Sequence, residues 1–227
     1  MPVVLVVLLV LTGCAANYKE IPDSVDVREL APGNGAIYGS MVSIRGGRSY
    51  SANAIRLRKK DEKDEVRIVS VKPSDFDGAW PNVYSDPVVD GVPFYFELEA
   101  GEWEFFTYGF GTLVGGGYKS WSPRREFSVP FSVTPGQLTY VGEISVCGMT
   151  GKNIFGLPIP IGAFVSFNDQ YERDSDYAVS TFAGLEKNGM LRGVPQAGSR
   201  TEGVVGFEAR SCPPRFDGEA QRDLAPN

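Results

Sequence analysis

The feature that most constrains the fold is an alternating apolar pattern near the middle of the chain. Phe94, Phe96 and Leu98 occupy every second position, which is the period of a β-strand with one buried face. Gly101 follows, and Trp103 then leads a second apolar segment. Since glycine tolerates the positive φ of a tight turn, we expect a β-hairpin here.

A second segment repeats this design. Residues 131–140 can be laid over residues 96–105, with apolar side chains at matching positions around Gly136. Long helical patterns are scarce, and hydrophobic residues make up 42% of the chain, which is enough for a core. These observations predict an all-β fold with antiparallel strands, either a sandwich or a barrel.

The form Phe-x-Leu-x-x-Gly-x-Trp-x-Phe of the first hairpin resembles the prealbumin-like (transthyretin or carboxypeptidase-regulatory) sandwiches of bacterial surface proteins. The second hairpin, from Phe127 through Ile144, is similar to segments of small bacterial lipoproteins. The resemblance covers roughly residues 35–167. It implies a prealbumin-like architecture, and architecture alone does not imply a function.

The amino-terminal segment indicates where the protein resides. Residues 3–11 form an apolar run without charge, too short to span a bilayer as a helix. The sequence Leu-Thr-Gly-Cys that ends at Cys14 resembles the lipobox of bacterial lipoproteins. This resemblance implies cleavage before Cys14, acylation of Cys14 and lipid anchoring to the bacterial envelope. Ala15, the next residue, is similar to that of lipoproteins released to the outer membrane. The alternative is that residues 3–11 form a buried strand and Cys14 is a core thiol.

These patterns divide the chain into four segments, and the third contains a helix. We expect a lipoprotein signal peptide at residues 1–13, an acylated cysteine and flexible tether at 14–34, a β-sandwich domain at 35–212, a C-terminal helix within it at about 169–187, and a disordered tail at 213–227. Asp169 can cap the helix, because Glu172 follows at the capping-box spacing. The helix would expose an acidic face made of Glu172, Asp174 and Asp176.

Several shorter stretches carry expectations of their own. Residues 35–45 have apolar side chains on both faces and predict a central strand. Residues 54–59 and 65–71 predict a hairpin with a charged tip. Residues 154–161 contain two prolines and predict an edge segment or an extended loop.

The glycine-rich stretch 109–118 predicts a flexible loop, because no helix follows it that could form a phosphate site. Phe110, Tyr118 and Trp121 lie in or beside this stretch. These aromatic side chains are candidates to contact a ligand at one end of the sandwich, or they form a lid over the core.

The chain has 3 cysteines. If Cys14 is acylated, Cys147 and Cys212 remain as an even pair, and an oxidising compartment favours a disulfide between them. Two separate buried thiols are the alternative.

The composition limits the chemistry that the chain can perform. It contains no histidine, so the commonest general base and metal ligand are missing, and we predict no catalytic residues, no metal site and no cofactor. The net charge of −6 argues against nucleic acid as a partner and against electrostatic docking of the whole chain to anionic lipid. We expect a membrane-anchored, non-catalytic binding or assembly module that meets an envelope protein or ligand. Two alternatives are a small-ligand or carbohydrate-binding domain that uses the loop aromatics, and an enzyme with an unrecognised carboxylate site.

Overall fold

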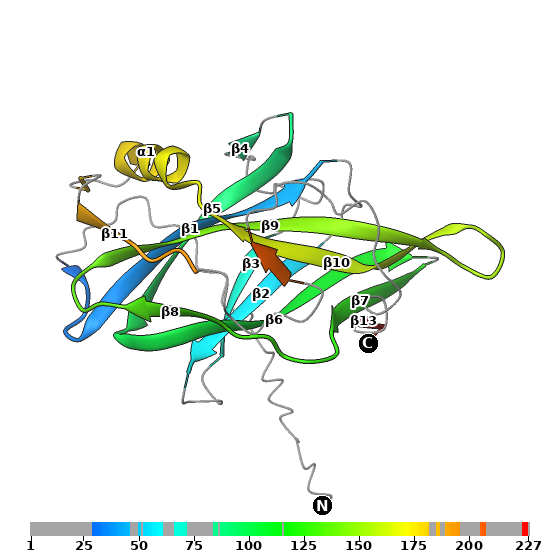
Figure 1. Ribbon diagram of the computed structural model, residues 1–227, viewed down its shortest axis with the longest axis horizontal. Helices are drawn as coiled ribbons and strands as arrows, with labels where there is room; N and C mark the ends of the chain where they lie inside the picture. Colours follow the sequence, from blue (N-terminus) through cyan, green and yellow to red (C-terminus); the bar gives the residue numbers. More distant parts are fainter. Residues whose placement is uncertain are drawn as a thin grey trace, which may run out of the picture.

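Two β-sheets pack face to face in the part of the chain that the computed structural model describes, and helix α1 (Tyr171–Thr181) covers the outer face of one of them (Figure 1). The described residues are 29–45, 50, 52–60, 66–71, 84–85, 87–114, 116–181, 185–186, 189–195, 205–207 and 224–226. The predicted all-β sandwich with one short helix is confirmed. The predicted signal peptide, Cys14 and Cys212 lie outside the described residues.

The first sheet is mixed. Its strand order is β12-β10-β9-β1-β5-β4, and β11 pairs with β9. The strands are β1 (Asn34–Ile44), β4 (Tyr84–Ser85), β5 (Val89–Glu99), β9 (Leu138–Lys152), β10 (Pro158–Asn168), β11 (Met190–Arg192) and β12 (Val205–Phe207). β1 is central, as predicted, but it pairs antiparallel with β5 and parallel with β9. The antiparallel prediction therefore holds for only part of this sheet.

In the second sheet every described pairing is antiparallel. Its strands are β2 (Ala52–Lys59), β3 (Val66–Val71), β6 (Gly101–Val114), β7 (Gly117–Pro123), β8 (Val129–Val133) and β13 (Leu224–Pro226). The β2–β3 hairpin confirms one prediction. Residues 224–226 lie in the predicted disordered tail, and that prediction is wrong for them because they pair with β7.

The two predicted central hairpins are also wrong. β5 belongs to the first sheet and β6 to the second, so the chain crosses between the sheets at Gly101. The chain crosses back between β8 and β9 at Gly136, and both glycines have positive φ. In a sandwich, the inner faces of both sheets point into one interior. The apolar alternation before and after a crossing therefore matches that of a hairpin.

The main core fills the space between the sheets. Its largest fully buried side chains come from both sheets and include Trp103, Tyr108, Phe105, Phe110 and Phe167. The Phe105 ring lies 4.8 Å from the Phe131 ring and 5.4 Å from the Phe167 ring, measured between centroids. This contact joins β6 to β8 within one sheet and to β10 of the other.

A bulge between β1 and β9 changes which way the side chains of β9 point. Tyr38 lies opposite Tyr140, but Ser40 lies opposite Glu143, so β9 carries one extra residue at this place. Val141 and Ile144 both belong to the core between the sheets. The extra residue therefore turns Glu143 away from that apolar core and towards the helix side of the sheet.

Gly142 makes this bulge possible, and we expect Gly142→Ala to destabilise the fold by roughly 1–2 kcal/mol. Its φ is +95°, and an added Cβ would lie 2.9 Å from the carbonyl oxygen of Asn168. Gly109→Ala is the matched control, because nothing lies within 4 Å of its Cβ position. Urea unfolding measures both changes. Equal stability of the two variants would contradict a strained backbone at Gly142.

Helix α1 is shorter than predicted, and more of its side chains are buried against the first sheet than predicted. Its described span ends at Thr181, and Leu185 and Glu186 are not helical, so the predicted end at about residue 187 is wrong. The backbone N–H of Tyr171 donates to Asp169 Oδ1 at 3.1 Å, which agrees with the predicted capping role of Asp169. Ala178 packs in a second cluster with Tyr38 and Tyr140 on the outer face of the first sheet.

Candidate functional site

The predicted ligand-contacting aromatics do not share a surface. Residues 109–118 are not a loop, because β6 and β7 form a hairpin through most of them. Phe110 and Trp121 lie opposite each other and are only 1% and 5% exposed, whereas Tyr118 is 59% exposed. Alternate residues of a strand point to opposite faces. The burial of Phe110 and Trp121 counts against a ligand-contacting role for them.

A buried polar cluster lies between α1 and the first sheet. Its members come from β1, β9, the end of β10 and α1, and they are Ser40, Tyr140, Glu143, Ser145, Asn168, Arg173 and Asp174. The side chains of Glu143 and Asp174 are both 0% exposed. The prediction that Asp174 belongs to a solvated acidic face is therefore wrong.

Arg173 lies between these two carboxylates. Its guanidinium donates to Glu143 Oε2 at 2.8 Å, to Asp174 Oδ1 at 2.5 Å and to Ser40 Oγ at 2.9 Å. The hydroxyls of Ser40 and Tyr140 donate to Asp174 Oδ2 at 2.7 and 2.9 Å. Asp174 thus receives hydrogen bonds at both oxygens, from β1, β9 and its own helix.

The Glu143 carboxylate also accepts hydrogen bonds from neighbouring side chains. Ser145 Oγ donates to Glu143 Oε1 at 2.6 Å, and Asn168 Nδ2 donates to Ser145 Oγ at 2.8 Å and to Glu143 Oε1 at 3.3 Å. These bonds join β9 to the last residue of β10. The cluster therefore fastens α1 to two strands of the sheet through charge-assisted hydrogen bonds.

Burial raises the pKa of two members of the cluster, Asp174 and Tyr140. Desolvation raises the pKa of Asp174 above its ordinary range, and the Arg173 charge and the hydrogen bonds from Ser40 and Tyr140 oppose this rise. Desolvation, followed by the Asp174 charge, raises the pKa of the Tyr140 hydroxyl. Because Arg173 pairs with both Glu143 and Asp174, the buried polar cluster is suited to hold α1 on the sheet. The alternative of a carboxylate enzyme stays an untested hypothesis.

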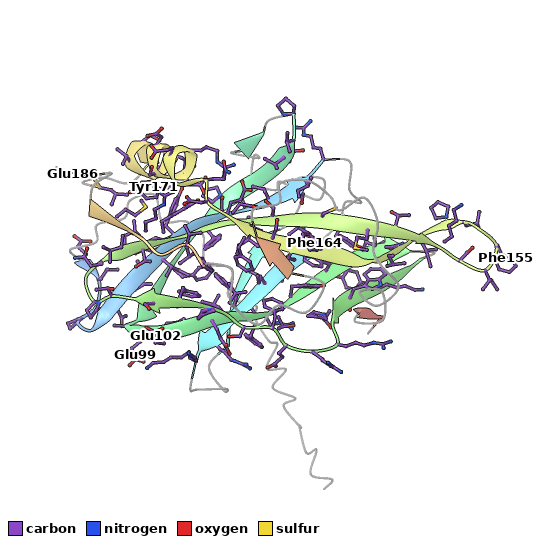
Figure 2. All side chains as sticks on the ribbon, in the orientation of Figure 1. Glu99, Glu102, Phe155, Phe164, Tyr171 and Glu186 are labelled. Carbon is purple, nitrogen blue, oxygen red and sulfur yellow. The ribbon has the colours of Figure 1, made fainter. Side chains whose placement is uncertain are left out.

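Ile154 and Phe155 have the two most exposed large apolar side chains of the described residues, and both lie at the end of the β9–β10 hairpin. Ile154 is 92% exposed, Phe155 78% and Leu157 59%. This hairpin extends beyond the rest of the molecule, and Phe155 lies at its end (Figure 2). We call residues 153–157 the hairpin tip. Contiguous exposed apolar side chains of this kind mark interaction sites in folded proteins.

Asn153 holds the hairpin tip in one conformation. Its Oδ1 accepts hydrogen bonds from the N–H groups of Phe155 and Leu157, both at 2.9 Å. Its backbone N–H donates to the Leu157 carbonyl and its own carbonyl accepts from Gly156, again at 2.9 Å. The predicted edge segment is present as the first residues of β10. The predicted alternative of an extended loop applies only to the hairpin tip.

Of the predicted cysteine sites, the structure describes only Cys147. It is 2% exposed and packs with Val42, Ile44 and Val89 in a small cluster. Because Cys212 and Cys14 lie outside the described ranges, the Cys147–Cys212 disulfide and the acylation of Cys14 stay predictions.

The sequence interpretation missed two groups of residues. Asp174 and Ser175 share the buried side of α1 with Ala178, and the helical spacing from Tyr171 could have placed them there. The orientation of Glu143 had no comparable signal, because it depends on the bulge at Gly142. At the hairpin tip, the signal was an apolar stretch whose only neighbouring charge is Lys152.

Within the described ranges, no helix has the length and apolar character needed to cross a membrane. No protein-family model matches the sequence, and no curated protein matches it. The solved structures that resemble it do so weakly, and they include the following two. A leucine-rich repeat protein from Bacteroides thetaiotaomicron aligns with 50% of this chain and 14% of its own, at 12% identity and a TM-score of 0.31. A candidate cell adhesion protein from Parabacteroides distasonis aligns with 60% of this chain and 38% of its own, at 10% identity and a TM-score of 0.30.

Proposed function

We propose that this protein is a non-catalytic binding module of the bacterial envelope, held at a membrane by acyl chains on Cys14, with the hairpin tip as its contact element. The observation that carries the binding role is the exposure of Ile154, Phe155 and Leu157 at the end of a projecting hairpin. Apolar side chains exposed in this way are unfavourable in water, and their burial against a partner lowers the free energy.

The anchoring half of the proposal is supported by the lipobox-like sequence before Cys14. Two or three acyl chains anchor a protein stably, whereas one chain binds only marginally. The non-catalytic part of the proposal is supported by the buried polar cluster, whose carboxylates are bonded to Arg173 and to neighbouring hydroxyls. In this account that cluster stabilises the domain and does not react with a substrate.

Membrane fractionation of the native host tests the proposal. We expect the wild-type protein in the membrane fraction, resistant to a high-salt wash, and the Cys14→Ser variant largely released by that wash. Val88→Ser is the matched control, because it introduces a serine at an exposed position and leaves Cys14 in place. Equal retention of the wild type and Cys14→Ser after washing would contradict anchoring through Cys14.

A further inference from the structure

The three exposed apolar residues of the hairpin tip point to a particular partner. We propose that the hairpin tip inserts into the interfacial region of a lipid bilayer that carries anionic headgroups. This inference rests on the proposed function, because it names the partner of the same contact element. A branched aliphatic, an aromatic and a second aliphatic side chain, exposed together, match the apolar face of proteins that lie in this interface.

The charge pattern around the hairpin tip favours lipid. Lys152 is the only charged residue between Glu143 and Asp169, although the whole chain carries a net charge of −6. Lys152 ends β9 immediately before the tip and is exposed. A lysine beside inserted apolar side chains can keep its stem in the apolar layer and its ammonium at the headgroup phosphates.

The backbone of the hairpin tip is also suited to an apolar medium, in which an unpaired N–H group is costly. The N–H groups of Asn153, Phe155, Gly156 and Leu157 all donate within the tip. The next residue is Pro158, which has no N–H group. Asn153 supplies the acceptors for three of these donors, so four of the five N–H groups of the tip have their hydrogen-bond partners within it.

The same region argues against a protein partner that would add a strand to β10. β12 pairs with β10 only at residues 165–167, and no described strand pairs with the outer side of β10 nearer the tip. Pro158 and Pro160 occupy that stretch, and proline cannot donate to a strand ladder. Side-chain insertion at the tip is therefore favoured over strand addition beside it.

Vesicle binding by the full-length chain tests this inference. The Cys14→Ser background removes the acyl chains, and every protein compared then keeps the same amino-terminal segment. The vesicles contain phosphatidylglycerol and phosphatidylcholine, or phosphatidylcholine alone. We expect the triple variant Ile154→Ser, Phe155→Ser and Leu157→Ser to lower the partition coefficient on mixed vesicles by about 100-fold. Lys152→Gln should lower it by about fivefold on mixed vesicles and leave it unchanged on phosphatidylcholine.

The matched control is a second triple serine variant at Val88, Val179 and Leu191, which are 42%, 40% and 42% exposed and lie away from the tip. It should bind vesicles as the parent does. In a separate variant, Phe155→Trp should add a component of fluorescence that lipids brominated in the acyl chain quench. Thermal unfolding of each variant checks that the fold is retained.

Equal partition of the two triple variants would overturn the inference, as would an added fluorescence component in Phe155→Trp that brominated lipids do not quench. If the tip variant weakens membrane retention in cells but not vesicle binding, the partner is an envelope protein and the lipid inference is wrong. The anchoring of Cys14 is measured separately by fractionation. A failure of lipid insertion can therefore be distinguished from a failure of the proposed anchor.

Discussion

Replacing Arg173 with methionine is expected to destabilise the fold by about 3–5 kcal/mol at neutral pH. Methionine keeps an apolar stem of similar reach but removes the charge. Glu143 and Asp174, both with fully buried side chains, would then lose the cation that lies between them. Removing one partner of a buried ionic network is costly because the remaining charges stay desolvated without compensation. Chemical unfolding followed by circular dichroism measures the loss.

The destabilisation should depend on pH. Burial already raises the pKa of Asp174 above its ordinary value of 3.8, so the folded state binds this proton more tightly than the unfolded state. Stability therefore falls as the pH rises from about 4 through the folded-state pKa. The Arg173 charge lowers that pKa, and its removal raises the pKa further. The deficit of Arg173→Met should be largest at neutral pH and should shrink on acidification.

Two further variants keep this prediction falsifiable. Arg173→Met combined with Asp174→Asn should recover part of the lost stability, because the amide needs no counter-charge. Arg192→Ala removes the exposed ion pair with Asp169 and should cost less than about 1 kcal/mol. If Arg173→Met lowers the free energy of unfolding no more than Arg192→Ala does, the buried polar cluster does not hold α1 to the sheet.

Replacing Trp103 with alanine should have an effect of similar size, about 3–5 kcal/mol. Trp103 is the largest fully buried side chain among the described residues and lies just after the crossing at Gly101. Its indole N–H donates to the Glu99 carbonyl at 2.9 Å, so one side chain fills the core and also closes the crossing from β5 to β6. Truncation would leave a cavity and an unpaired carbonyl.

Trp103→Phe separates these two contributions. It keeps an aromatic ring in the core and removes the indole N–H, and it should cost about 1–2 kcal/mol. Urea unfolding of both variants gives the comparison. A loss below about 1 kcal/mol for Trp103→Ala would mean that the crossing and the core do not depend on this residue.

Local pattern was enough to predict strands but not the partners of those strands. The alternation of Phe94, Phe96 and Leu98 correctly indicated a strand with these side chains in the core, but the strand is not half-buried, because Tyr95 on its other face is buried as well. Residues 35–45 correctly indicated a central strand. The same alternation could not distinguish a hairpin from a crossing between sheets. In both cases the apolar side chains on either side of Gly101 point into one interior, and only the hydrogen-bond partners differ.

Sequence pattern also failed to predict which face a side chain occupies where tertiary structure decides it. The parallel pairing of β1 with β9 joins segments far apart in the chain, and the bulge at Gly142 then decides that Glu143 faces the helix. The burial of Phe110 and Trp121 follows from the β6–β7 hairpin, whereas the glycine-rich pattern had predicted a flexible loop. By contrast, the buried position of Asp174 follows from helical spacing and was available from the sequence.

Mass spectrometry of the mature amino terminus, purified from membranes of the native host, tests the tethered module most directly. We expect a chain that begins at Cys14 and carries the mass of two or three acyl chains, and we expect this species to be lost in Cys14→Ser. An unmodified terminus on a chain that retains residues 1–13 would contradict it. Cys14 would then become a candidate for pairing with Cys147, and the proposed anchor would have to be abandoned.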